Sequence, residues 1–131
     1  MPLPMRAVFA VSMLGLAWLG TAEAQDAVTK RDSQGPVTVA VTPLGSVTVG
    51  APLKIKIVLD THSVGLDGVA FDKAVALRAP EGAEVAPQAV ETKGSGHHRE
   101  AVVTFPPPPG GPLRIVVKGV AGVAERLFTW D

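Results

Sequence analysis

Cysteine is absent from this 131-residue chain, and methionine, histidine and aromatic residues are scarce. Without cysteine no disulfide can form, so the fold must be held together by its buried apolar side chains. The same absence excludes a blue-copper centre and the zinc sites built on cysteine pairs. The three methionines are Met1, Met5 and Met13, which leaves no thioether for a Cu(I) site further along the chain.

Charge of either sign is also lacking, because twelve basic residues balance twelve acidic residues. No cluster of lysine and arginine interrupts this balance. A basic patch is the usual mark of a nucleic-acid-binding protein and of attraction to anionic membranes. The composition therefore argues against a polyanionic partner and predicts no nucleic-acid binding.

The N-terminus has the pattern of a secretory signal. Arg6 precedes an apolar run from Ala7 to Gly20, and the small residues Thr21 to Ala24 follow it. This order is typical of a signal peptide, so we predict that residues 1–24 are cleaved before Gln25. The run of 14 residues is shorter than the roughly 20 that span a membrane, and we expect no membrane span after cleavage. The product is predicted to be periplasmic or secreted.

The rest of the chain predicts an all-β fold. Short β-rich runs are separated by proline and glycine, and no segment shows sustained helical spacing of apolar residues. We expect an immunoglobulin-like (Ig-like) or Greek-key antiparallel β-sandwich of about seven strands over residues 37–131, preceded by a flexible segment over residues 25–36. The strands are predicted at Val37–Thr42, Leu53–Asp60, Val69–Arg78, Ala86–Glu91, Glu100–Phe105, Leu113–Gly119 and Ala124–Trp130.

Several connections and side chains have specific expected roles. Ser46–Val49 is predicted to add an extended piece at a sheet edge. The proline-rich stretch Pro106–Pro112 should form a stiff loop, and Gly119–Gly122 a hairpin turn. Arg126 is expected to reach a carboxylate such as Asp72, or to lie over an aromatic ring. The four aromatic residues expected to anchor the core are Phe71, Phe105, Phe128 and Trp130.

All three histidines fall in two short motifs at the ends of predicted strands. His62 belongs to Asp60-Thr61-His62-Ser63, and His97 and His98 belong to Gly94-Ser95-Gly96-His97-His98-Arg99. If the two strands are neighbours, His62 can meet one of the pair, because adjacent residues of a strand point to opposite faces. Nitrogen and carboxylate ligands suit Cu(II), Zn(II) or Ni(II). The predicted metal ligands are His62, His97 or His98, Asp60 and Asp67, with Cu(II) the preferred ion and Zn(II) next.

Two other interpretations of the histidines remain open. His62 can cap a loop while His97 and His98 form a solvated turn, in which case the domain binds another envelope protein through a strand edge or the same loops. A pH-sensing role is a variant of this interpretation. Consecutive residues such as His62 and Ser63 cannot form a catalytic triad, so we expect no enzyme activity and assign no catalytic residue.

Three motifs together resemble a set of small exported bacterial proteins. They are Asp60 to Asp67 (D-x-H-S-x-x-L-D), Gly94 to Arg99 (G-x-G-H-H-R), and the segment from Gly119 to Trp130 that contains E-R-x-F-x-W. The resemblance implies an exported β-sandwich and brings no activity with it. In size, export and scarcity of cysteine the chain is also similar to periplasmic copper-resistance β-sandwiches. Those use a histidine at the mature N-terminus, where this chain is expected to begin with Gln25.

Overall fold

The computed structural model describes residues 26–131, so the predicted signal peptide and its cleavage site lie outside the described residues. Within residues 26–131 the chain forms nine strands and one short helix. In chain order these are β1 (Lys30–Asp32), β2 (Val37–Leu44), β3 (Leu53–Thr61), α1 (Phe71–Ala74), β4 (Val75–Arg78), β5 (Glu84–Val85), β6 (Ala89–Ser95), β7 (His98–Phe105), β8 (Leu113–Val120) and β9 (Val123–Trp130). No helix in this part of the chain is long and apolar enough to cross a membrane.

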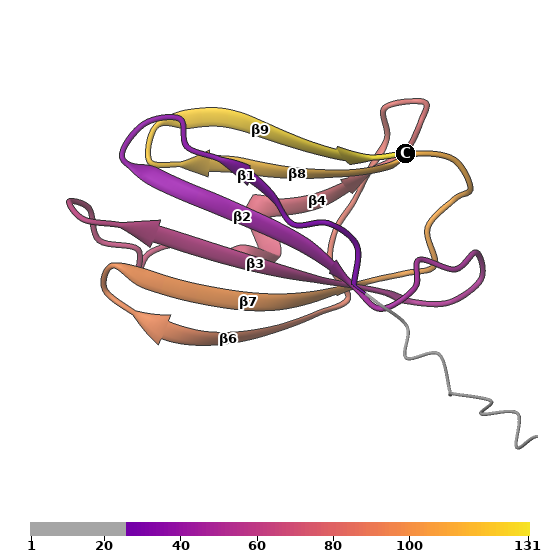
Figure 1. The fold of residues 1–131 in the computed structure, drawn as a ribbon, viewed down its shortest axis with the longest axis horizontal. Coiled ribbons are helices and arrows are strands. Elements are labelled where there is room, and N and C mark those ends of the chain that lie inside the picture. Colours follow the sequence, from indigo (N-terminus) through magenta and orange to yellow (C-terminus); the bar gives the residue numbers. More distant parts are fainter. Residues whose placement is uncertain (1–25) are drawn as a thin grey trace, which may run out of the picture.

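Two antiparallel sheets pack face to face (Figure 1). Sheet A has the strand order β1-β2-β3-β7-β6, and sheet B has the order β5-β4-β8-β9. Apart from the short β1, these orders are those of strands A-B-E-D and C′-C-F-G of an immunoglobulin domain. The structure confirms the predicted Ig-like β-sandwich. The two strands beyond the expected seven are β1 and β5, which have three and two residues.

The core follows the alternation of apolar and polar residues in the sequence. In β3, Leu53, Ile55, Ile57 and Leu59 are buried, whereas the residues between them face outward from sheet A. Each buried aliphatic side chain of this size contributes about 1.5–3 kcal/mol relative to an exposed one. Three of the four predicted core aromatics are fully buried, and Trp130 is half-buried at one end of the sandwich.

The segment before β2 differs from the predicted flexible lead-in. It contains strand β1, which pairs antiparallel with β2. The side-chain amine of Lys30 donates to the carbonyl of Thr129 in β9, and Asp32 pairs with Arg126 of the same strand. The charged side chains of Lys30 and Asp32, which are typical of a solvated segment, are therefore bonded to β9. Arg126 therefore reaches a carboxylate, as predicted, but that carboxylate belongs to Asp32 and not to Asp72.

Two predicted strands are divided in the structure. Val69–Arg78 contains the single turn of α1 and only then β4, so the strand is limited to its last four residues. Ala86–Glu91 covers the gap between β5 and β6, which belong to different sheets. Pro87 lies in this gap, and proline cannot donate to a ladder. The chain therefore crosses from sheet B to sheet A at this point.

The predicted turns are confirmed, but one extended piece is not. Ala121 and Gly122 connect β8 to β9 with φ of 53° and 76°, as a tight hairpin turn with two left-handed residues requires. The proline-rich loop connects β7 of sheet A to β8 of sheet B. Ser46–Val49 forms no strand, and it lies between Gly45 and Gly50, which have φ of 66° and 87°.

Candidate functional site

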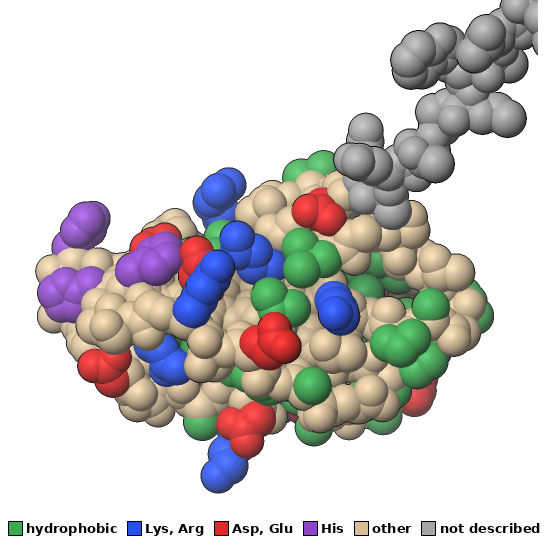
Figure 2. Space-filling model, turned by 90° about the horizontal axis from the view of Figure 1, so that it is seen from below, with side chains coloured by type: hydrophobic (Ala, Val, Ile, Leu, Met, Phe, Trp, Pro, Cys, Tyr) green, Lys and Arg blue, Asp and Glu red, His purple; other side chains and the backbone are tan. Residues whose placement is uncertain are grey.

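The two histidine motifs come together at one end of sheet A. Strands β3 and β7 are neighbours, and Asp60 lies opposite His98 in their register. The backbone N–H of Thr61 donates to the carbonyl oxygen of His97 at 3.0 Å. Figure 2 shows the histidine side chains gathered at one end of the molecule, while apolar side chains are more common over the opposite half. We call the first region, defined by His62, His97 and His98, the histidine end.

The side chain of Asp67 forms a structural hydrogen bond at the histidine end. Its carboxylate accepts a hydrogen bond from the backbone N–H of Gly96 at 2.8 Å. The carbonyl of Gly96 in turn accepts from the N–H of Leu66 at 2.9 Å. Gly96 has φ of 67°, which suits the first central position of a two-residue hairpin turn between β6 and β7. Asp67 therefore ties the β3–α1 loop, residues 62–70, to this turn, and its carboxylate is already engaged there.

Arg99 strengthens the same connection. Its guanidinium donates to the carbonyls of Leu66 and Val69 at 3.0 and 2.8 Å and lies 4.9 Å from the ring centre of Phe71. Gly94, across the hairpin, has φ of 85°, and a Cβ there would collide with the carbonyl oxygen of His98. These contacts, together with those of Asp67, form what we call the clasp. The clasp therefore gives a structural reason for Asp67 in the first histidine motif and for Gly94 and Arg99 in the second.

Outside the clasp, His98 forms a polar cluster on the outer face of sheet A. Its Nδ1 bonds the carboxylate of Asp60, and its Nε2 lies 3.1 Å from a carboxylate oxygen of Glu100. The hydrogen bond to Asp60 and then that to Glu100 raise the pKa of His98 above its ordinary value of 6.5. The hydrogen bond from His98 likewise lowers the pKa of Glu100, against its partial burial, with help from Lys56 and Lys93. Both imidazole nitrogens are thus engaged by carboxylates, which favours the protonated ring.

His62 and His97 remain exposed at the histidine end. His62 lines a shallow hollow together with Asp60, Thr61 and residues of the β1–β2 region. The buried hydroxyl of Thr61 fixes the start of this loop by donating to the carbonyl of Pro36 at 2.8 Å. Within residues 26–131 no three histidine or acidic side chains converge as they would around a metal ion. Of the five predicted ligands, only Asp60 and His98 are in direct side-chain contact.

A second region was not predicted from the sequence. Within residues 26–131, three of the four most exposed large hydrophobic side chains lie at the opposite end of the sandwich: Val28 is 74% exposed, Val47 46% and Val49 75%. Val28 and Val47 line a hollow whose floor includes Trp130 and Leu113. We call this region, defined by Val28, Val47, Val49 and Trp130, the apolar end.

The contacts of Trp130 position the apolar end. Its indole N–H donates to the carbonyl of Val28 at 2.7 Å, and the amine of Lys30 lies 5.6 Å from its ring centre. A signal for this region is present in the sequence, since Val47 and Val49 alternate with polar residues as an edge strand would. The flanking glycines turn this segment into an exposed loop, so the valines face solvent.

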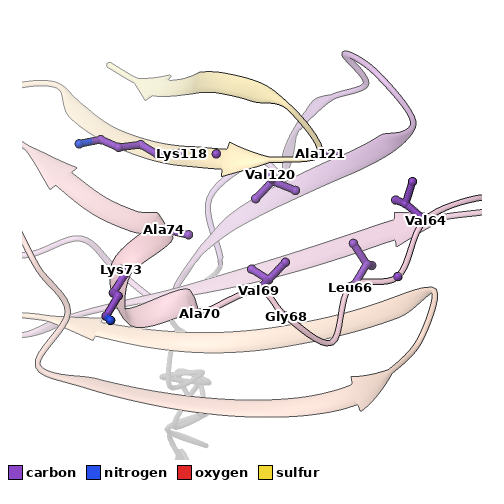
Figure 3. Close-up of a pocket in the computed structure, with 12 residues that line it drawn as sticks. Val64, Leu66, Gly68, Val69, Ala70, Lys73, Ala74, Lys118, Val120 and Ala121 are labelled. Atoms are coloured by element: carbon purple, nitrogen blue, oxygen red, sulfur yellow. The ribbon is translucent and has the colours of Figure 1, made fainter.

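A third hollow lies between the β3–α1 loop and the end of β8 (Figure 3). Leu66 and Val69 point into it from the loop, and Val120 points into it from β8. The only polar side chains among its lining residues are those of Lys73 and Lys118, and both amines point away from it. Lys118 is already paired with Glu84. This hollow therefore offers an apolar surface without a group to orient a ligand.

No family model, curated protein or solved structure matches this chain. The resemblance to small exported bacterial proteins stays a prediction from the motifs.

Proposed function

We propose that this chain is a non-enzymatic, exported binding domain that docks another protein of the cell envelope on its apolar end. The observation that carries the proposal is the exposure of Val28 and Val47 at the hollow that Trp130 also lines, with Val49 exposed in the same loop as Val47. Soluble domains seldom leave neighbouring large apolar side chains in water unless another surface covers them. The aromatic ring beneath a rim of aliphatic groups is the kind of arrangement that anchors a protein interface.

The size of the apolar end suits a protein segment. Burying Val28, Val47 and Val49 contributes about 1–2 kcal/mol each, or about 3–6 kcal/mol in total. A micromolar complex needs about 8 kcal/mol, so these side chains supply a large share of it. The partner we propose presents an apolar segment here, with an acidic group close enough to meet Lys30 at the rim.

The test compares two sets of serine substitutions in the exported chain. Val28→Ser, Val47→Ser and Val49→Ser together remove the exposed valines without touching the core. Leu127→Ser is the matched control, because Leu127 is 51% exposed on the outer face of sheet B. A stoichiometric envelope partner should be captured by the wild-type chain and by the control in the presence of a chelator, and lost by the triple variant. Equal capture by all three chains would contradict the proposal.

A second candidate function, divalent-metal binding, is supported by the pair of donors on His98 and Glu100, which a third side chain would have to join. Two ligands of one tetrahedral ion at about 2.0–2.1 Å are roughly 3.3 Å apart. The separation of 3.1 Å between Nε2 of His98 and Glu100 is close to this value. Asp60 bonds the other ring nitrogen, as a carboxylate does behind many metal-bound histidines. His62, beside Asp60, is the side chain that would swing in as a further ligand to Cu(II) or Zn(II).

Calorimetric titration with Cu(II), Zn(II) and Ni(II) tests this second candidate. His98→Gln should abolish a saturable site, and His62→Ala should weaken it. His97→Gln is the control, because His97 lies in the turn beyond the strand and contributes its carbonyl group to the fold. Saturable binding that survives His98→Gln would exclude the proposed ligand set. Because binding must displace the proton of His98, affinity should also fall at acid pH.

A further inference from the structure

Strand β6 is a long and mostly exposed edge of sheet A. The four edge strands are β1, β6, β5 and β9. Of these, β1 and β5 have only three and two residues, and the carbonyl of Thr129 in β9 already accepts a hydrogen bond from Lys30. By contrast, β6 has seven residues, and most of them are exposed. An edge of this length presents a row of free backbone groups to any strand that approaches it.

The hydrogen-bond parity of the sheet identifies these free groups. The N–H of Thr61 donates to the carbonyl of His97, which directly precedes β7. This bond shows that the odd-numbered residues of β7 direct their backbone groups toward β3. Even-numbered residues of β7 therefore face β6, and they meet the odd-numbered residues of β6 in register. The backbone groups of Val90 and Thr92 consequently point away from the sheet.

The side chains of β6 in one copy are complementary in charge to those of β6 in a second copy. Glu91 and Lys93 lie on the outer face of sheet A, on either side of Thr92. When two copies of β6 run antiparallel about a two-fold axis at Thr92, each Glu91 lies opposite Lys93 of the second copy. The two Thr92 residues then exchange both backbone hydrogen bonds, and the free backbone groups of Val90 lie beside Gly94 of the second copy. Opposite charges at directly opposed positions stabilise such a pair.

We propose that the domain forms a homodimer by antiparallel pairing of β6 with β6 of a second copy, centred on Thr92. The pairing joins two copies of sheet A into one continuous sheet with closed point-group symmetry. It leaves the apolar end of each copy uncovered, because that end lies at the β1 side of sheet A, so it is independent of the proposed docking function.

Charge reversal tests the pairing without altering the core. Sedimentation equilibrium between about 1 μM and 1 mM should show a concentration-dependent dimer for the wild-type chain. Lys93→Glu or Glu91→Lys places like charges opposite each other at both contacts, and each should weaken the dimer at least about tenfold. The double variant E91K/K93E restores opposite charges and should recover most of the affinity. Circular dichroism confirms that each variant is folded.

Hydrogen exchange supplies an independent measurement. The amides of Val90 and Thr92 should exchange more slowly as the protein concentration rises, and this protection should be lost in Lys93→Glu. A wild-type chain that stays monomeric up to about 1 mM would overturn the proposal and leave the edge free for a strand of a different protein. A dimer that both single variants form as well as the wild type would also overturn it.

Discussion

Because the guanidinium of Arg126 is buried, removal of its carboxylate partner Asp32 should destabilise the fold strongly. The side chain of Arg126 has 0% exposure, and its NH1 bonds the carboxylate of Asp32 at 3.0 Å. The carbonyls of Val37 and Val120 accept further hydrogen bonds at 2.9 and 3.3 Å, while its Nε has no partner. Asp32→Ala leaves this positive charge buried among carbonyl dipoles alone. Breaking a buried pair from one side costs about 3–5 kcal/mol.

We expect the lower end of that range, about 3 kcal/mol, because Asp32 is itself 19% exposed and water can enter in its place. For a domain of this size the melting temperature should fall by about 10–20 °C. Urea denaturation followed by the fluorescence of Trp130 measures the change, with the exposed Asp72→Ala as the control. A loss below about 1 kcal/mol would refute the reasoning, since it would mean that the guanidinium is hydrated or finds another partner.

The same pair predicts an acid-dependent loss of stability. Burial alone would raise the pKa of Asp32, but hydrogen bonds from the backbone and side chain of Gln34 and the charge of Arg126 outweigh it and lower the pKa below the ordinary 3.8. A lowered carboxylate pKa stabilises the folded state at pH above 3.8, and this contribution is lost as the pH falls through the folded-state value. The difference in stability between the wild type and Asp32→Ala should therefore shrink below pH 3.8.

Three further predictions each concern one local contact. Ala121→Asn should raise the free energy of unfolding by about 0.5–1 kcal/mol, because asparagine tolerates the left-handed region better than alanine; a lower melting temperature would contradict this. Gly94→Ala should lower the free energy of unfolding, measured by urea denaturation, by about 2 kcal/mol or more. The added methyl group collides with the carbonyl of His98, and residue 94 has a positive φ; a neutral result would show that the hairpin relaxes. The raised pKa of His98 stabilises the fold below pH 6.5 and loses this effect as the pH rises through the folded-state value. In Asp60→Asn the imidazole signals of His98 should titrate at a lower pH in NMR spectra, and an unchanged midpoint would exclude Asp60 as the main cause.

The parts of the fold that follow from local pattern were predictable. Leu53, Ile55, Ile57 and Leu59 alternate with a second set of residues that is mostly charged, and this period can bury one face only if the segment is a strand. The β8–β9 turn was predictable because glycine provides the left-handed conformation that it requires. In both cases the relevant interaction lies within a few residues of the chain.

The parts that were not predictable depend on partners far away in the sequence. Asp32 and Arg126 are 94 residues apart, and nothing near either one identifies the other. The single turn of α1 begins at the buried Phe71, against which Arg99 stacks from a different strand. The apolar end depends on glycines that turn Val47 and Val49 outward, although their spacing is that of a strand.

The two histidine motifs contain residues that stabilise the fold and residues to which a chemical role can be assigned. Gly94, Gly96, Asp67 and Arg99 are explained by the clasp, which fixes the β3–α1 loop against the β6–β7 turn. Because these roles need a carboxylate, a guanidinium, glycines and backbone groups, they would be met without any histidine side chain. The fixed backbone nevertheless holds His98 opposite Asp60. The cluster of His98, Asp60 and Glu100 is therefore the part of the two motifs and their surroundings to which a chemical role can be assigned. Substitutions in the clasp should therefore change stability first, whereas His98→Gln should change binding or pH response while the fold persists.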